Sequence, residues 1–250
     1  MPHMPPKNKK PAHVPAAPTA FALRANLRAF ASPEQAKVTL GFFKTGPGEY
    51  AEGDQFIGIK VPVIRKLIKP YVRMPITEIQ TLLHSQIHED RMAALLLMVA
   101  RFETGGPKAR KEMYDFYMGE LRWVNNWDLV DVSAAPIVGA WLQGQDRGIL
   151  RKMAKSKNMW ERRIAMLATH QFIKTGESGE TFVIAAMLLK DEHDLIHKAV
   201  GWMLREVGKH VGENTLRGFL KEHAPGMPRT ALRYAIEHFP VDEKYQWLAA

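Results

Sequence analysis

A short pattern of residues returns at nearly constant intervals along this chain. The segments EDRMAALLLMVARF, WERRIAMLATHQFI and LIHKAVGWMLREVG each place a basic residue ahead of small and apolar positions. Arg91 and Arg163 of the first two segments lie 72 positions apart, and Lys198 of the third follows 35 positions later. The midpoint of the first interval falls on Trp127, and a fifth copy, MPRTALRYAIEHF, places Arg229 31 residues after Lys198. Such a period indicates a repeat architecture, in which one structural unit is stacked several times.

The pattern within each copy is helical. From Ser32 onward apolar residues recur at spacings of three and four, and strictly alternating runs of β-branched residues are scarce. A helical-hairpin repeat of the HEAT type occupies roughly 35 to 47 residues, which is close to these intervals. We therefore predict an all-α fold, an α-solenoid or superhelix of HEAT-like helical hairpins whose second helices line a concave surface.

Composition divides the chain into a tail and one folded unit. Residues 1–31 contain basic residues and many prolines but no acidic residue, because the first acidic residue is Glu34. We predict a largely disordered basic tail over residues 1–31 and a single HEAT-like repeat domain over residues 32–250. No apolar run approaches the roughly 18 residues that a membrane-spanning helix needs, and the prolines interrupt the hydrophobic region that a secretion signal requires.

Cysteine content and charge narrow the classes of function. The chain has no cysteine, which excludes disulfides, thiolate zinc sites and thiol catalysis and is compatible with a reducing cytoplasm. Its formal net charge is +9, and residues 32–250 keep +4 of this charge when the five basic residues of the tail are set aside. A folded unit that stays basic is suited to a polyanion, so nucleic acid is the leading class of partner.

The repeated position is the first candidate for function. Arg91, Trp127, Arg163, Lys198 and Arg229 would form a track along the concave face, and a cationic groove with aromatic residues suits a sugar-phosphate backbone. Packing between helices accounts for the small residues of the repeats but not for basic or aromatic residues that return to one edge. The alternative is that these residues cap helices or are surface charges near helix ends, and the residues alone leave both interpretations open.

Two histidine pairs have the spacing of a metal-binding helix. In HSQIH, which joins His84 and His88, a serine stands where a zinc hydrolase has its catalytic glutamate. In HDLIH, which joins His193 and His197, an aspartate stands there and is one methylene shorter. We interpret both pairs as solvated helix ends and expect no metal and no cofactor. The glycine-rich segment at 44–60 is predicted to be a loop, and it lacks the residues of a phosphate-binding loop.

The segment VNNWDLVD contains the strongest candidate for chemistry. Asp128 follows two asparagines that are good helix caps, so a charge at this helix N-terminus needs no functional explanation. Asp131 lies further along the helix and shares a face with Trp127. A carboxylate next to the apolar run that follows needs a partner, and Arg163 of the next repeat is the candidate. The pair is either a structural ion pair or a catalytic carboxylate held by an arginine.

These motifs together carry a family resemblance. NNWDLVD, WERRIAMLATHQFI, HKAVGWMLREVGK and PRTALRYAIEHF, preceded by GEYAEGDQFIGIKVPVIRKL, resemble segments of the bacterial AlkD-like DNA glycosylases of alkylation repair, over residues 32–239. The resemblance implies a HEAT-like superhelix, in agreement with the period. It also implies removal of positively charged N3- and N7-alkylated purines from duplex DNA, without flipping of the base into a pocket. We expect a monomer that acts in the cytoplasm on nucleoid DNA.

The resemblance assigns roles residue by residue. The family's catalytic aspartate falls on Asp131, its two groove tryptophans fall on Trp127 and Trp202, and its motif arginine falls on Arg163. Phe42 is the nearest match to an aromatic residue that contacts DNA in the family, but it lacks a hydroxyl group. Subgroups that have lost glycosylase activity are expected to differ at these positions, so the intact residues favour an active enzyme.

Two other functions fit the same scaffold. A non-catalytic binder of branched or bent DNA would need the basic residues but not Asp131. A protein-interaction solenoid, like many helical-repeat proteins, would have an apolar or mixed groove rather than a cationic one.

Overall fold

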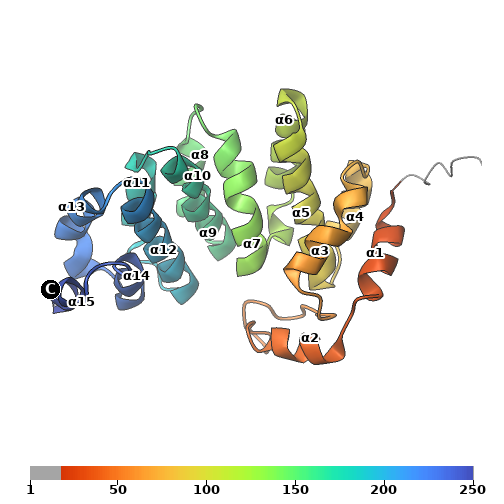
Figure 1. Cartoon of the computed structure of the whole chain (residues 1–250), viewed down its shortest axis with the longest axis horizontal. Coiled ribbons are helices and arrows are strands. Elements are labelled where there is room, and N and C mark those ends of the chain that lie inside the picture. Colours follow the sequence, from red (N-terminus) through yellow and green to blue (C-terminus); the bar gives the residue numbers. More distant parts are fainter. Residues whose placement is uncertain (1–17, 250) are drawn as a thin grey trace, which may run out of the picture.

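The computed structural model describes residues 18–249, and it confirms the all-α fold. Its α-helices are α1 (Ala20–Arg28), α2 (Pro33–Leu40), α3 (Val61–Leu67), α4 (Ile76–Leu83), α5 (His88–Thr104), α6 (Pro107–Gly119), α7 (Trp127–Ser133), α8 (Gly148–Ala154), α9 (Met159–Ala168), α10 (His170–Lys174), α11 (Gly179–Leu188), α12 (Asp194–His210), α13 (Glu213–His223), α14 (Arg229–Ala235) and α15 (Val241–Ala249). Shorter helical turns are η1 (Lys69–Tyr71), η2 (Leu121–Trp123), the π-helical η3 (Ala134–Gly139) and η4 (Ala224–Gly226). The helices follow one another along a curved row from α1 to α15 (Figure 1).

One layer of this row carries the repeated position. In this layer α5, α7, α9, α12 and α14 each contact the next helix. The five repeated residues fall in the first or second turn of these helices in the same order, at positions 91, 127, 163, 198 and 229. Helices α4, α6, α8, α11 and α13 each pack against a helix of this layer. The sequence period therefore corresponds to helical hairpins stacked side by side.

Glycines let adjacent helices approach closely, both within this layer and between η3 and α9. A Cβ atom on Gly201 of α12 would lie 2.4 Å from the carbonyl oxygen of Ala231 in α14. A Cβ atom on Gly139 would lie 2.2 Å from the carbonyl oxygen of Ala168 in α9. Both distances are too short for any larger residue, so the spacing of the helices depends on these glycines. No helix in residues 18–249 is long and apolar enough to cross a membrane.

The N-terminal boundary of the fold differs from the prediction. Residues 20–28, which we assigned to the disordered tail, form α1, and Thr19 caps this helix by accepting a hydrogen bond from the Ala22 amide. Leu23 and Leu27 are fully buried in the core, and α1 packs against α3 and α4. The spacing of these two leucines indicates a helix, but the prolines and basic residues around them masked it. Residues 1–17 of the predicted tail lie outside the described residues.

Candidate active-site groove

Six of the eight predicted site residues line one hollow of about 620 Å³, which we call the site groove. Its walls are formed by α7, α9 and α12 together with the segment at 41–58, and Tyr234 of α14 closes one side. The predicted residues that line it are Phe42, Trp127, Asp131, Arg163, Lys198 and Trp202. These residues are up to 160 positions apart in the sequence and are brought together because the repeats stack in register.

Asp131 and Arg163 form a bidentate ion pair within the site groove. The Nε atom of Arg163 donates to Oδ1 of Asp131 at 2.9 Å, and its NH2 group donates to Oδ2 at 2.9 Å. Arg163 is only 4% exposed and also donates to the carbonyl oxygen of Leu195 at the start of α12. The arginine therefore connects three successive repeats while it fixes both oxygens of the carboxylate. The predicted partner of Asp131 is confirmed.

Burial and the ion pair act on Asp131 in opposite directions. Burial disfavours the charged carboxylate and raises the pKa of Asp131 to about 6, although Arg163 acts to lower it. At neutral pH the group is therefore ionised. Its side chain keeps 19% of its surface exposed, toward the site groove. The groove thus contains a partly desolvated carboxylate in a fixed orientation, which suits the stabilisation of a nearby positive charge.

The two tryptophans are held by different neighbours. Trp127 is the first residue of α7, where the Asn126 side chain caps the helix by accepting from the Trp127 amide at 2.8 Å. Its ring stacks on Phe43, with centroids 5.1 Å apart. Trp202 lies on α12, and its Nε1 atom donates to Oε1 of Glu206 at 3.2 Å. Each indole ring therefore has a defined position and leaves part of its surface in the groove.

The segment at 41–58 contributes groove residues that the sequence analysis did not identify. Phe43, Lys44 and Tyr50 all line the site groove. Tyr50 reaches the opposite wall, where its ring makes edge contacts with Trp160 and His193 at 5.7 and 6.4 Å. Phe42 lines the groove as predicted and is 68% exposed. The cluster of aromatic residues in a glycine-rich loop was the available signal for this part of the site.

Arg91 does not belong to the site groove, which corrects its assignment as a DNA-binding residue. It is 2% exposed, and it donates to Oδ1 of Asp54 at 2.7 Å and to the carbonyl oxygen of Ser85 at 3.0 Å. The proposed cationic track is therefore interrupted at Arg91 and at Arg163, which are both engaged in buried ion pairs. Asp54 is the partner that the sequence analysis missed, because it lies in the glycine-rich loop rather than on a repeat helix.

The other two basic residues of the track remain accessible. Lys198 lines the site groove and pairs with Asp194 at 2.8 Å on the same helix. Arg229 is exposed at the first position of α14, outside the residues that line the groove. These two residues can still contact a phosphate backbone, whereas the buried arginines cannot.

His88 is buried rather than solvated, which corrects the interpretation of HSQIH. Its Nε2 atom lies 2.8 Å from Oδ2 of Asp128, and its Nδ1 atom lies 3.4 Å from Oδ2 of Asp54. Burial lowers the pKa of His88, but the two carboxylates outweigh it and raise the pKa to about 8. A protonated His88 therefore connects the loop to the first turn of α7, next to Trp127.

The remaining histidines of the two pairs have protein partners at helix ends. His84 lies 2.7 Å from Glu120 and stacks on Trp123. His193 caps α12 by accepting from the Leu195 amide, and His197 bonds to the carbonyl oxygen of Asp191. These contacts account for the two pairs without a metal.

Comparison with known proteins agrees with this architecture. The family model described as DNA alkylation repair enzyme matches residues 23–239. A predicted DNA alkylation repair enzyme from Enterococcus faecalis is 18% identical, with a TM-score of 0.65, over 84% of this chain and 97% of that one.

AlkD2 from Streptococcus mutans, a crystal structure, is also 18% identical, with a TM-score of 0.52, over 88% of this chain and 99% of that one. At this identity the two structures support the fold alone. No curated protein matches the chain. The family match covers most of the chain, including all of the site groove, and we conclude that the protein belongs to the DNA alkylation repair enzyme family, with a role in alkylation repair and DNA as its partner.

Proposed function

We propose that the protein is a DNA glycosylase that hydrolyses the N-glycosidic bond of cationic N3- and N7-alkylated purines in duplex DNA. The observation that carries the proposal is the ionised carboxylate of Asp131, held by Arg163 in one groove with Trp127 and Trp202. A fixed carboxylate flanked by aromatic faces is an arrangement that stabilises a developing positive charge.

The chemistry of the substrate explains how so few groups suffice. An N3- or N7-alkylated purine carries a positive charge, and the bond to C1′ breaks with its electron pair moving to the purine. The departing base becomes neutral, so no general acid is needed to protonate it. The deoxyribose meanwhile gains oxocarbenium character, as in glycoside hydrolysis. Water then forms a bond to C1′ and gives up a proton to the Asp131 carboxylate, which passes it to solvent.

The groove residues have different roles in this reaction. The Asp131 carboxylate stabilises the oxocarbenium-like sugar and accepts a hydrogen bond from the attacking water, which places its oxygen at C1′. The faces of Trp127 and Trp202 pack against the deoxyribose and favour nearby positive charge. Arg163 orients the carboxylate through the bidentate ion pair and does not contact the sugar. This division predicts selection by the charge of the lesion, so neutral lesions are not released.

Release of N7-methylguanine from methylated duplex DNA tests the proposal. Asp131→Asn keeps the size of the side chain and removes its charge, so we expect the rate of base release to fall by about 100-fold or more. Asp194→Asn is the matched control, because Asp194 is a second carboxylate that lines the same groove. We expect its rate to stay within a few-fold of wild type.

Two results would contradict different parts of the proposal. If the wild-type protein releases no more base than buffer alone, the glycosylase function is wrong. If Asp131→Asn releases base as fast as wild type, the function stands and the assignment of Asp131 is wrong.

A further inference from the structure

Two histidines and a glutamate converge beside Trp202. Glu206 and His210 lie one turn apart on α12, and His170 is the first residue of α10. One candidate metal-binding atom from each residue lies within 4.8 Å of the other two. Oε2 of Glu206 is 3.2 Å from Nε2 of His210 and 3.9 Å from Nε2 of His170. Ligands at the usual Zn²⁺ distance in a tetrahedral site are roughly 3.3 Å apart, so small side-chain rotations would close this set around one ion.

The types of ligand match a particular class of ion. Two imidazoles and one carboxylate suit zinc and other divalent transition metals, whereas calcium and magnesium favour sets made of oxygen atoms alone. Three protein ligands leave a fourth position open to water or to another oxygen ligand. Glu206 is 7% exposed, and a carboxylate at this depth requires compensation of its charge. Arg205 and Trp202 contact Oε1 of Glu206, and a bound cation would compensate the charge at Oε2.

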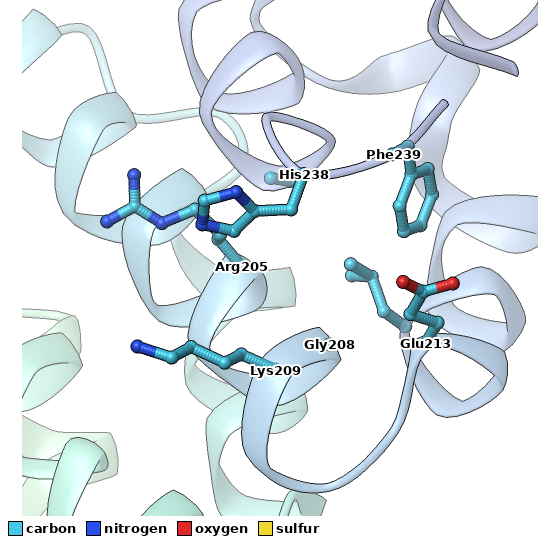
Figure 2. Close-up of a pocket in the computed structure, with 8 residues that line it drawn as sticks. Arg205, Gly208, Lys209, Glu213, His238 and Phe239 are labelled. Atoms are coloured by element: carbon cyan, nitrogen blue, oxygen red, sulfur yellow. The ribbon is translucent and has the colours of Figure 1, made fainter. Parts of the chain in front are cut away.

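The surroundings of the cluster also contain positive charge that a metal ion would have to overcome. Arg205 lies 3.5 Å from Glu206 through its NH2 group, and Figure 2 shows Arg205 and Lys209 projecting from the same helix beside His238. Arg205 is also paired with Glu237, which offsets part of its charge. We therefore expect an affinity in the range of an exchangeable ion rather than that of a closed structural zinc site.

We propose that His170, Glu206 and His210 bind a divalent transition-metal ion of the zinc type and that this ion fixes the ring of Trp202. Oε2 of Glu206 faces the two histidines, while Oε1 accepts from Trp202 at 3.2 Å. Of the three residues, His170 also lines a second hollow of about 890 Å³, together with Trp202 and Asp131. The consequence of a fixed Trp202 ring for activity rests on the proposed glycosylase function, but binding of the ion and its effect on the ring do not.

The repeat explains why the three residues meet. His170 and Glu206 are 36 positions apart, which is one repeat, so stacking places α10 and α12 side by side. His210 follows Glu206 at the i, i+4 spacing that puts both side chains on one helix face. The predicted histidine pairs had this spacing within one segment, whereas this cluster joins two repeats.

Isothermal titration with ZnCl₂ tests the site on the full chain after removal of metal by EDTA and dialysis. We expect one saturable Zn²⁺ site at this cluster, weakened roughly tenfold or more in His170→Ala and in His210→Ala, since loss of even an outer-shell partner costs that much. Glu206→Gln should weaken it similarly without a change in side-chain size. His238→Ala is the control, because His238 is exposed and lies outside the cluster.

The design separates this site from other sources of zinc binding. His3 and His13 are present in every variant, so any Zn²⁺ that they hold is a constant background. His210 is half-exposed at the end of α12, so His210→Ala should fold, and circular dichroism checks this. If wild type shows no Zn²⁺ site, or if the three cluster variants bind Zn²⁺ as wild type does, the proposal is wrong.

Tryptophan fluorescence tests the connection to Trp202. We expect Zn²⁺ to change the emission of wild type and to leave that of Trp202→Phe nearly unchanged, while both proteins bind Zn²⁺ with affinities within about twofold, because Trp202 is an outer-shell neighbour and not a ligand. An equal change in both proteins would show that the ion does not act on Trp202. Neither measurement uses DNA, so a failed glycosylase assay would leave these results valid.

Discussion

Two arginines at the same position of the repeat form ion pairs with carboxylates that differ in exposure. Arg91 on α5 pairs with Asp54, and Arg163 on α9 pairs with Asp131. Asp54 belongs to the glycine-rich loop and its side chain is 7% exposed, whereas that of Asp131 is 19% exposed and faces the site groove. One ion pair is sealed inside the fold and the other is open to a ligand.

The pKa values of the two carboxylates are shifted in opposite directions, because Asp54 has two cationic partners and Asp131 has one. Burial would raise the pKa of Asp54, but His88 and Arg91 together outweigh it and lower the pKa. Asp131 has one cationic partner, and burial prevails, so its pKa is raised to about 6. Ionisation of Asp54 therefore stabilises the fold, while ionisation of Asp131 costs stability. A charged group that destabilises the fold is more readily explained by function than by structure.

The largest expected effect concerns the buried Asp54–Arg91 ion pair. Asp54→Asn leaves Arg91 buried without a charged partner and also removes a carboxylate from His88, so we expect the free energy of unfolding to fall by about 3–5 kcal/mol. Asp131→Asn also leaves Arg163 without its charged partner, but it removes a carboxylate whose ionisation burial opposes, so we expect a smaller loss of about 1–3 kcal/mol. Urea denaturation of both variants measures this, and equal losses would remove the distinction between the pairs.

The second prediction separates activity from stability at the two arginines. Lysine cannot form the bidentate contact that orients a carboxylate, so Arg163→Lys should slow N7-methylguanine release by about tenfold or more. Arg91→Lys should leave the rate of release close to wild type and instead lower the free energy of unfolding. Single-turnover rates and urea midpoints measure the two effects. A rate that falls equally in both variants would mean that the groove does not distinguish the two pairs.

The third prediction concerns His88, the buried histidine that contacts Asp54 of the Asp54–Arg91 ion pair. The shift in the pKa of His88 from 6.5 to about 8 corresponds to about 2 kcal/mol of stability. Because the folded-state pKa is raised, this contribution is fully present below pH 6.5 and is lost as the pH rises through about 8. Unfolding measured from pH 6 to pH 9 should show the loss in wild type and not in His88→Gln. A free energy of unfolding that does not change with pH in wild type would contradict this prediction.

The fourth prediction concerns the pH dependence of base release. Asp131 acts as a carboxylate, so the rate should increase as the pH rises through about 6 and should fall about tenfold per pH unit well below this value. Rates of N7-methylguanine release between pH 5 and pH 8 test this, with correction for spontaneous loss of the base. A rate independent of pH in this range would exclude ionisation of Asp131 as the controlling step.

The smallest expected effect concerns the remaining basic residues. Lys198→Ala should weaken binding to unmodified duplex DNA and reduce the slope of log affinity against log salt concentration by about one, as for the loss of one phosphate contact. Arg229→Ala should act similarly if the duplex extends to α14. Arg91→Lys is the comparison variant and should leave the slope unchanged, because Arg91 is buried. Binding that does not depend on salt would favour a protein-interaction solenoid instead.

Most of the repeat could be predicted from the sequence, because it depends on local spacing. The interval between Arg91, Trp127 and Arg163 located successive helices of one layer, and the i, i+4 relation placed Trp127 and Asp131 on one face. The pairing of Asp131 with Arg163 also followed, since adjacent repeats must contact each other. The packing of α1 into the core was not predicted. The prolines and basic residues around Leu23 and Leu27 indicated a disordered tail, although the spacing of the two leucines is that of a helix.

The errors at Arg91 and His88 share a cause, because the contacts of both residues depend on the loop at 41–58. Nothing in the sequence fixed where this loop would lie, so the burial of Arg91 and His88 against Asp54 could not be predicted. The same holds for Phe43 and Tyr50 in the site groove. Loop conformation depends on the surfaces it meets, and these exist only after the repeats have packed.

The sequence by itself determined the all-α repeat, the order of its helices and the side of α7 that carries Trp127 and Asp131, because helix periodicity and repeat length are local properties. The tertiary structure decided which charged residues are accessible. Arg91 and Arg163 occupy one repeat position, but the carboxylate partner of Arg91 is buried in the loop, whereas that of Arg163 lies on α7 and faces the site groove. Burial depends on everything packed around a residue, so the use of a charge is decided by the fold rather than by its place in the repeat.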